Sequence, residues 1–172
     1  LGEYEKAIAD YSKAIEIDSK YAYAYAHRGD SYQKLGEHDK AIEDYSKAIE
    51  IDSKYDYAYA HRGDSYHNLG EYEKAIEAYS KAIEIDPKYR YTYGRRGDSY
   101  QKLEEYEKAI ADYSKAIEIE PKYAYAYTCR GGSYRNLGEY EKAIADYSKA
   151  IEIEPKYRYA YAGRGISYQK LE

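Results

Sequence analysis

Apolar and aromatic positions recur along the chain at intervals of three and four residues, which is the spacing of one face of an α-helix. Charged residues occupy most of the remaining positions and predict a solvated opposite face. This pattern predicts one helix over residues 3–17 and a second helix from about Tyr21 to Lys34, closed by Leu35 and Gly36. The apolar set of the first helix is Tyr4, Ala7, Ile8, Tyr11, Ala14 and Ile15.

The same pair of helices recurs every 34 residues. Aligning Leu1 with every thirty-fourth residue after it brings five units into register, with only Leu171 and Glu172 left over. A period of this length is typical of a solenoid, in which each unit stacks on its neighbours to bury its apolar face. Each unit is short enough to form one antiparallel helix hairpin, because a helix of about 14 residues spans about 21 Å.

Proline and glycine mark the ends of the predicted helices. Proline stops a preceding helix, and glycine caps a helix by adopting a left-handed conformation. One unit carries Glu104 at the glycine position, where we expect it to cost local stability. The prolines are Pro87, Pro121 and Pro155, and the glycines are Gly2, Gly36, Gly70 and Gly138.

A large residue, a small residue, an aromatic residue, alanine, a second aromatic residue, alanine and proline recur at fixed offsets. One unit reads Tyr59, Gly63, Tyr66, Ala75, Tyr79, Ala82 and Pro87, and the same series recurs 34 and 68 residues later. This series resembles the tetratricopeptide repeat. The resemblance covers the whole chain and implies an all-α fold, a right-handed superhelical solenoid of antiparallel helix hairpins.

In the phase of that family, the chain is expected to form one solenoid domain over 1–172. Because the chain begins in mid-pattern, we expect it to be a fragment of a longer array. The predicted parts are the second helix of a partial repeat at 1–21, complete repeats at 22–55, 56–89, 90–123 and 124–157, and the first helix of a partial repeat at 158–172.

Two features depart from the family pattern. Arginine occupies a position that usually holds a leucine-like residue, as at Arg28, and we expect it to pair with a carboxylate of a neighbouring helix. The chain also has 29 Tyr and no Phe or Trp. Tyr25, Tyr32 and Tyr45 are predicted to lie in the core, where a buried hydroxyl needs a hydrogen-bond partner.

Twenty of the 34 repeat positions are identical in all five units, and much of the variation falls on one face of the second predicted helix. A face that meets a non-repeating ligand is free to vary, although neutral drift on a solvated face is the alternative explanation. The resemblance implies that this helix lines a concave groove that binds peptides. The predicted contact residues are Tyr23, His27, Asp30, Gln33, Tyr57, His61, Asp64, His67, Tyr91, Arg95, Asp98, Gln101, Tyr125 and Arg135.

Charge along this face indicates the kind of ligand. Asp30, Asp64 and Asp98 lie beside tyrosines, which suits a Lys- or Arg-containing segment through charge complementarity and cation-π contact. The sequence therefore favours a non-catalytic protein–protein interaction scaffold that binds a basic peptide segment. The alternative is a structural module that self-associates head to tail through its unpaired terminal helices, because near-identical units make the two ends complementary.

Composition argues against other classes of function. The net charge of −5 argues against nucleic acid as a partner, and no apolar run is long enough to span a membrane. Cys129 is the only cysteine, so no intrachain disulfide can form, and a reducing compartment, with the cytoplasm favoured, is compatible. No HExxH motif, P-loop or nucleophile elbow is present, so we expect no enzyme activity, no cofactor and no metal site.

Overall fold

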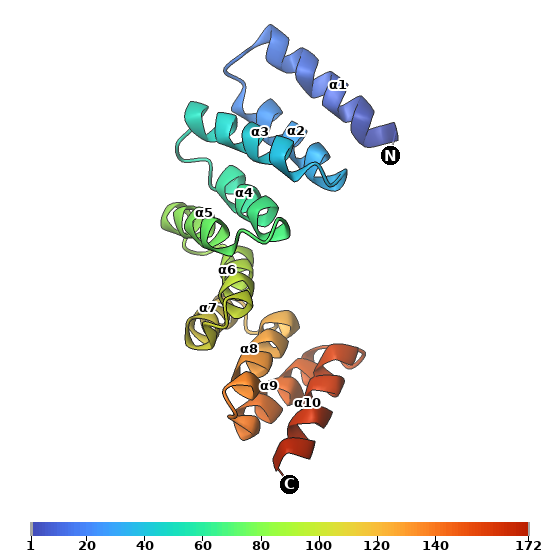
Figure 1. The fold of residues 1–172 in the computed structure, drawn as a ribbon, viewed down its shortest axis with the longest axis vertical. Coiled ribbons are helices and arrows are strands. Elements are labelled where there is room, and N and C mark those ends of the chain that lie inside the picture. The colour runs from blue at the N-terminus through green and yellow to red at the C-terminus, as the bar shows by residue number, and fades with distance from the viewer. Residues whose placement is uncertain (1, 172) are drawn as a thin grey trace. The chain divides into compact units, whose positions relative to one another are not determined.

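The structure is a computed structural model that describes residues 2–171, and over that range it contains ten α-helices and no strand (Figure 1). The all-α prediction is therefore confirmed. Leu1 and Glu172, the outer ends of the two predicted partial repeats, lie outside the described residues. The helices are α1 (Gly2–Ile17), α2 (Ala22–Lys34), α3 (His38–Ile51), α4 (Asp56–Asn68), α5 (Tyr72–Ile85), α6 (Arg90–Lys102), α7 (Tyr106–Ile119), α8 (Ala124–Asn136), α9 (Tyr140–Ile153) and α10 (Arg158–Leu171).

The turns within the hairpins use the predicted left-handed residue. Gly36, Gly70 and Gly138 have φ angles of 79°, 80° and 78°. Glu104 adopts the same conformation, with φ of 60°, although its side chain makes that conformation unfavourable. The prediction for Gly2 was wrong, because Gly2 begins α1 and caps no helix within residues 2–171.

The chain divides into two compact units, Leu1–Pro87 and Lys88–Glu172, which we describe separately. In the first unit, α1 packs on α2, α2 on α3, α3 on α4 and α4 on α5. In the second unit, α6 packs on α7, α7 on α8, α8 on α9 and α9 on α10. Within each unit, every helix therefore contacts the next helix along the chain, as stacked hairpins require.

Alanine and tyrosine build the core of each hairpin. Tyr45 is fully buried among small residues such as Ala41 and Ala48, which confirms its predicted core position. Tyr25 and Tyr32 are partly buried and pack against the same cluster. Glycine on the facing helix makes room for the tyrosine ring, since a Cβ atom added at Gly29 would lie 3.0 Å from Tyr45 Cε1.

The repeated arginine forms the predicted intramolecular ion pair. Arg28 Nε and Nη2 donate to the two carboxylate oxygens of Asp44 at 2.7 Å, and Arg96 with Asp112 and Arg130 with Asp146 form the same arrangement. Bidentate pairs of this kind fix the relative position of two helices as well as stabilising them. They account for an arginine at a position where a leucine-like residue was expected.

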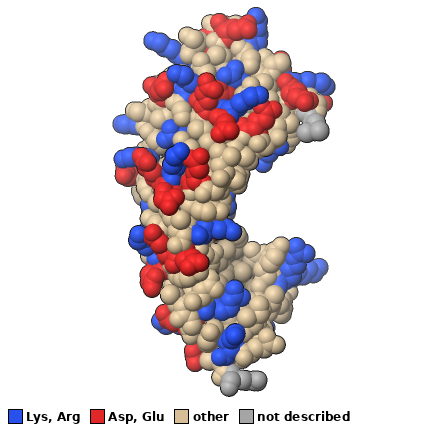
Figure 2. Space-filling view, in the orientation of Figure 1, with Lys and Arg blue, Asp and Glu red and all other residues tan. Residues whose placement is uncertain are grey.

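Charged residues occupy part of the molecular surface, with uncharged areas between them (Figure 2). Acidic and basic side chains are interspersed on the face shown in Figure 2. Several form pairs one helical turn apart, such as Lys13 with Glu16 at 2.6 Å, and such exposed pairs contribute little to stability. No helix among the described residues is both long enough and apolar enough to span a membrane.

Candidate functional site

In the first unit, four of the predicted contact residues form a continuous row of rings along α2 and α4. Tyr23 and His27 have ring centroids 4.0 Å apart, His27 and Tyr57 are 5.4 Å apart, and Tyr57 and His61 are 4.1 Å apart. We call these four residues the aromatic ladder. Tyr23 is the most open of the four, with 49% of its surface exposed. The helix spacing of four residues places Tyr23 beside His27 and Tyr57 beside His61.

The carboxylate of Asp30 lies behind the ladder and holds it in place. It accepts hydrogen bonds from the hydroxyls of Tyr45 and Tyr57, each 2.8 Å long, and its Oδ2 lies 2.7 Å from His27 Nδ1. The Asp30 side chain is 24% exposed. Asp30 therefore orients two rings of the ladder while keeping part of its own surface open.

The other predicted polar residues of the first unit make contacts within the protein. Asp64 is buried and accepts a 2.7 Å hydrogen bond from the Tyr79 hydroxyl. Gln33 Nε2 donates to the His61 carbonyl oxygen and to Ser65 Oγ at 3.2 and 3.1 Å, which joins α2 to α4. His67 packs edge-on against Tyr72 of α5, with ring centroids 5.2 Å apart. The structure thus brings the ladder together but turns His67 towards α5.

The second unit repeats the tyrosine–carboxylate arrangement around Asp98. This carboxylate accepts hydrogen bonds from Arg95 Nη1 at 3.0 Å, the Tyr113 hydroxyl at 2.8 Å and the Tyr125 hydroxyl at 2.6 Å. Tyr91 stacks on Tyr89, with ring centroids 5.6 Å apart. Arg135, the last predicted contact residue, is half-buried on α8.

Gln101 has the same contacts in the second unit that Gln33 has in the first. Its Nε2 donates to the Cys129 carbonyl oxygen at 3.3 Å and to Ser133 Oγ at 3.2 Å. Gln33 therefore joins α2 to α4, and Gln101 joins α6 to α8 in the same way.

Burial sets the protonation of the groups behind this face. It raises the pKa of the Tyr45, Tyr113 and Tyr125 hydroxyls above the usual range, so these groups remain protonated donors to aspartate at alkaline pH values at which an exposed tyrosine ionises. Burial likewise raises the pKa of the Cys129 thiol to about 12, which does not suit a nucleophile. Within residues 2–171, no three His, Cys, Asp or Glu side chains gather in an arrangement that could hold a metal ion.

The sequence interpretation missed the tyrosines of α3 and α7 that donate to the aspartates of the preceding helices. Tyr45 and Tyr113 each follow their aspartate by 15 residues, and this constant separation was a usable signal. The interpretation also missed Tyr147, which follows Gly132 at the same separation in the repeat where the aspartate is missing.

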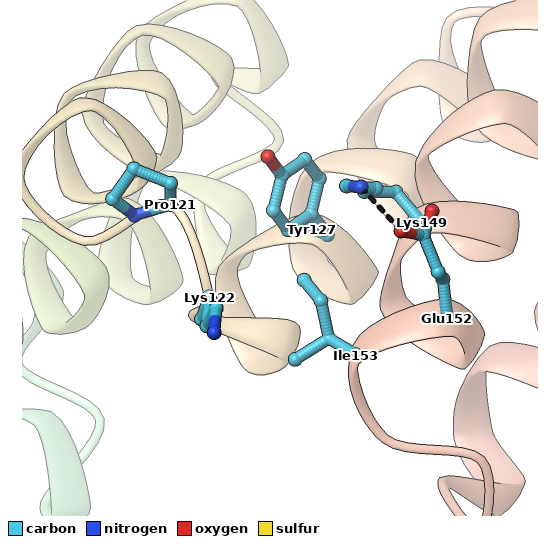
Figure 3. Close-up of a pocket in the computed structure, with 6 residues that line it drawn as sticks. All are labelled: Pro121, Lys122, Tyr127, Lys149, Glu152 and Ile153. Carbon is cyan, nitrogen blue, oxygen red and sulfur yellow. Dashed lines mark hydrogen bonds and ion pairs between the residues drawn. The ribbon is translucent and has the colours of Figure 1, made fainter.

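A pocket of about 410 Å³ lies in the second unit between the α7–α8 loop, α8 and α9 (Figure 3). Lys149 Nζ donates to Glu152 at 2.8 Å across its rim. All of its lining residues except the proline are identical in the five units, which indicates a by-product of the repeated packing. The lining residues are Pro121, Lys122, Tyr127, Lys149, Glu152 and Ile153.

Models of one protein family match most of the chain. The model described as "Tetratricopeptide repeat" matches residues 57–89, 91–123 and 124–157. A second model, described as "TPR repeat", matches residues 1–36 and 29–70. A search of curated proteins finds no match.

Solved structures of similar fold agree with these matches. The crystal structure of MamA has 30% sequence identity and a TM-score of 0.85, covering 90% of this chain and 91% of that chain. YrrB, described as a TPR protein with an unusual peptide-binding site, has 24% identity and a TM-score of 0.79, covering 92% and 82%. The first TPR domain of Spaghetti, solved with an HSP90 peptide, has 28% identity and a TM-score of 0.67, covering 70% and 95%.

Proposed function

Because the chain belongs to the tetratricopeptide-repeat family, we propose that it is a non-catalytic scaffold that binds a peptide segment of a partner protein. The proposed site in the first unit is the aromatic ladder on α2 and α4. Two of the similar structures are described as having a peptide-binding site or a bound peptide, which supports a role of this kind. The observation that carries the proposal is the ladder itself, a partly exposed row of oriented rings.

Rings held in this way are suited to binding a peptide. Tyrosine offers a large contact area at low conformational-entropy cost, and aromatic anchors dominate many protein interfaces. Asp30 fixes the orientation of His27 and Tyr57 before any ligand arrives, which lowers the entropy lost on binding. Tyr23 remains open at one end of the row.

The charge behind the ladder favours a basic peptide. The Asp30 carboxylate is partly exposed beneath rings whose faces attract cations. A Lys or Arg side chain of the peptide would meet both the face of a ring such as Tyr23 and the negative field of Asp30. We therefore propose a Lys- or Arg-containing segment as the ligand.

Labelled peptides test this proposal directly. Fluorescence anisotropy would compare a 12-residue peptide of alternating Ala and Lys with one of alternating Ala and Glu. We expect the Lys peptide to bind more tightly and Tyr23→Ala to weaken its binding about tenfold or more, because an interface anchor is worth more than 1 kcal/mol. Circular dichroism should show unchanged helicity in this variant.

Tyr4→Ala is the matched control, since Tyr4 is similarly exposed at 42% but lies on α1, outside the ladder. This variant should bind as the unchanged protein does. Equal weakening by Tyr4→Ala and Tyr23→Ala, or no binding of either peptide, would refute the ladder as the site.

A second candidate function is head-to-tail self-association, and the contacts of α10 favour it. Tyr161 and Tyr168 are 46% and 53% exposed, whereas their equivalents Tyr127 and Tyr134 pack against α9. Arg164 donates to Ser148 Oγ at 3.0 Å but pairs with no carboxylate within residues 2–171. The face of α10 that corresponds to the α9-facing side of α8 is therefore available to a second copy.

The repeat pattern specifies the complementary residue on that second copy. Asp10 is exposed on α1 and occupies the repeat position of Asp44 and Asp146, which pair with the repeated arginine. Sedimentation velocity should show mass rising with concentration, and Arg164→Asp should suppress that rise. Mixing Arg164→Asp with Asp10→Arg protein should restore heterologous association, and failure to restore it would argue against this contact.

A further inference from the structure

One aspartate of α2 and one of α6 each accept hydrogen bonds from two tyrosines, and the separations along the chain are the same in both cases. One tyrosine follows the aspartate by 15 residues and the other by 27 residues. The carboxylate is the common acceptor that holds both hydroxyls in place. The two clusters are Asp30 with Tyr45 and Tyr57, and Asp98 with Tyr113 and Tyr125.

One repeat beyond Asp98, the two tyrosines are present but the carboxylate is not. The residue 34 positions after Asp98 is Gly132, and the tyrosines at the same two separations are Tyr147 and Tyr159. The protein therefore carries both donors of the cluster and lacks the acceptor.

The Tyr147 hydroxyl is directed at the place where the aspartate side chain would lie. A Cβ atom added at Gly132 would lie 3.7 Å from Tyr147 Oη and 3.3 Å from Gln101 Nε2. Tyr147 is only 2% exposed, yet its hydroxyl has no hydrogen-bond partner within residues 2–171. Tyr147 Oη is not one of the fully buried polar atoms, so the tip of the hydroxyl still reaches solvent and can donate to an acceptor that enters beside Gly132.

Tyr159 differs from its equivalent Tyr125. Its ring is 58% exposed and lies edge-on to Tyr157 at an interplanar angle of 83°, whereas the rings of Tyr125 and Tyr123 meet at 34°. Its hydroxyl accepts a 2.9 Å hydrogen bond from Arg158, whereas the Tyr125 hydroxyl donates to Asp98. The equivalence to Tyr125 makes Tyr159 the second candidate donor in this repeat.

A positive charge lies beside the same recess. Arg135 is one helical turn after Gly132 on α8 and forms no ion pair within the described part of the chain. Its charge opposes the effect of burial, which raises the pKa of Tyr147, so the guanidinium lies within electrostatic reach of that hydroxyl. Gly132 itself is half-buried, so part of its surface is accessible to a ligand.

We propose that the recess bounded by Gly132, Arg135, Tyr147 and Tyr159 binds a carboxylate of the partner peptide. The ligand carboxylate takes the place that the Asp98 side chain has one repeat earlier, accepts the Tyr147 hydrogen bond and is attracted by Arg135. This inference rests on the proposed peptide-binding function and adds an acidic anchor point in the second unit. The carboxylate belongs to an Asp or Glu side chain or to a peptide C-terminus.

Three short peptides separate the sources of the carboxylate. The first is N-acetyl-Ala-Ala-Glu-Ala-Ala-amide, the second replaces Glu with Gln, and the third is the Gln peptide with a free C-terminal carboxylate. In ¹⁵N–¹H NMR titrations of the full chain, we expect saturable shifts of the Gly132 amide with a dissociation constant on the order of 1 mM. The neutral Gln amide should give none, and the responding peptide identifies the source.

Variants then test the recess. Gly132→Asp supplies the carboxylate from within and should abolish the shifts of the neighbouring Gly131 and Ser133 amides. It should fold because aspartate occupies the same position in three other units. Tyr147→Phe should weaken binding about tenfold, since it removes one charge-assisted hydrogen bond. Gly165→Ala on α10, with nothing within 4 Å of the added carbon, is the control and should bind normally.

The two proposals fail in different ways. If no carboxylate peptide shifts Gly132, or if the Gln amide shifts it equally, the recess proposal is wrong, whatever happens at the ladder. If the Lys peptide also leaves the His27 and Tyr57 amides unshifted, the proposed function fails with it. Shifts at the ladder alone would leave the scaffold proposal intact.

Discussion

Arg28 of α2 and Asp44 of α3 are joined by two parallel hydrogen bonds, each 2.7 Å long. Burial raises the pKa of the Asp44 carboxyl and the nearby Arg28 opposes that rise. The equivalent arginine of the next hairpin, Arg62, meets Ala78 at the aspartate position, and its Nε is buried without a hydrogen-bond partner. The second hairpin thus carries the cost of a buried cation without its carboxylate.

Ala78→Asp should restore this ion pair and stabilise the protein. We expect the free energy of unfolding to rise by about 1–2 kcal/mol, because the gain from charged hydrogen bonds exceeds the cost of burying the new carboxylate. Urea denaturation followed by circular dichroism would measure the change. In an Arg62→Met background the same substitution should destabilise, and a gain there would contradict the pairing.

Glu104→Gly should also stabilise the protein. Glu104 has a φ of 60°, a left-handed conformation that costs a residue with a side chain about 1–2 kcal/mol and costs glycine almost nothing. We expect a gain of about 1 kcal/mol after subtracting the extra entropy of glycine in the unfolded chain. The reverse substitution, Gly138→Glu, should lower the thermal midpoint, and a loss of stability in Glu104→Gly would contradict the strain.

The sequence predicted the hairpins and their turns because both depend on local interactions. The three- and four-residue spacing of apolar positions specifies the helices, and Gly36 follows from the backbone angles that a helix cap requires. The pairing of Arg28 was predictable in kind, since a buried cation needs an anion, but the choice of Asp44 depends on how two helices pack.

The polar groups of the candidate site were harder to interpret from sequence. Variation among repeats placed Asp30 and Asp64 on a ligand-facing surface, yet both accept hydrogen bonds from tyrosines of the following helix. Variation among repeats does not distinguish a solvated side chain from a buried one, because a residue can vary in either environment when its neighbours also differ between repeats. His67 was placed on the same surface for the same reason, but its ring packs against Tyr72.

Alkaline pH should unfold the protein partly through its buried tyrosines. Burial raises the pKa of Tyr113 above its ordinary value of 10.0, so above that pH the unfolded chain loses a proton that the folded chain keeps. The unfolded state then binds fewer protons, and stability falls as pH rises, by about 1.4 kcal/mol per pH unit for each such group. Urea denaturation at pH 9 to 11 would measure the fall.

Tyr113→Phe should flatten this pH dependence while lowering stability at pH 7, because the hydrogen bond to Asp98 is lost. The lysines titrate over the same range in both proteins, so the difference in slope isolates Tyr113. Tyr4→Phe, at an exposed tyrosine, should leave the slope unchanged. Equal slopes in all three proteins would show that Tyr113 does not carry the effect.

Two glycines of α10 should respond to the same substitution in opposite directions. A Cβ atom at Gly163 would lie 2.3 Å from Tyr147 Cζ, whereas a Cβ atom at Gly165 meets nothing within 4 Å. Gly163→Ala should therefore destabilise by about 1–3 kcal/mol through overpacking. Gly165→Ala should stabilise by up to about 1 kcal/mol through helix propensity. Urea midpoints that move together would show that the Tyr147 ring does not pack tightly against Gly163.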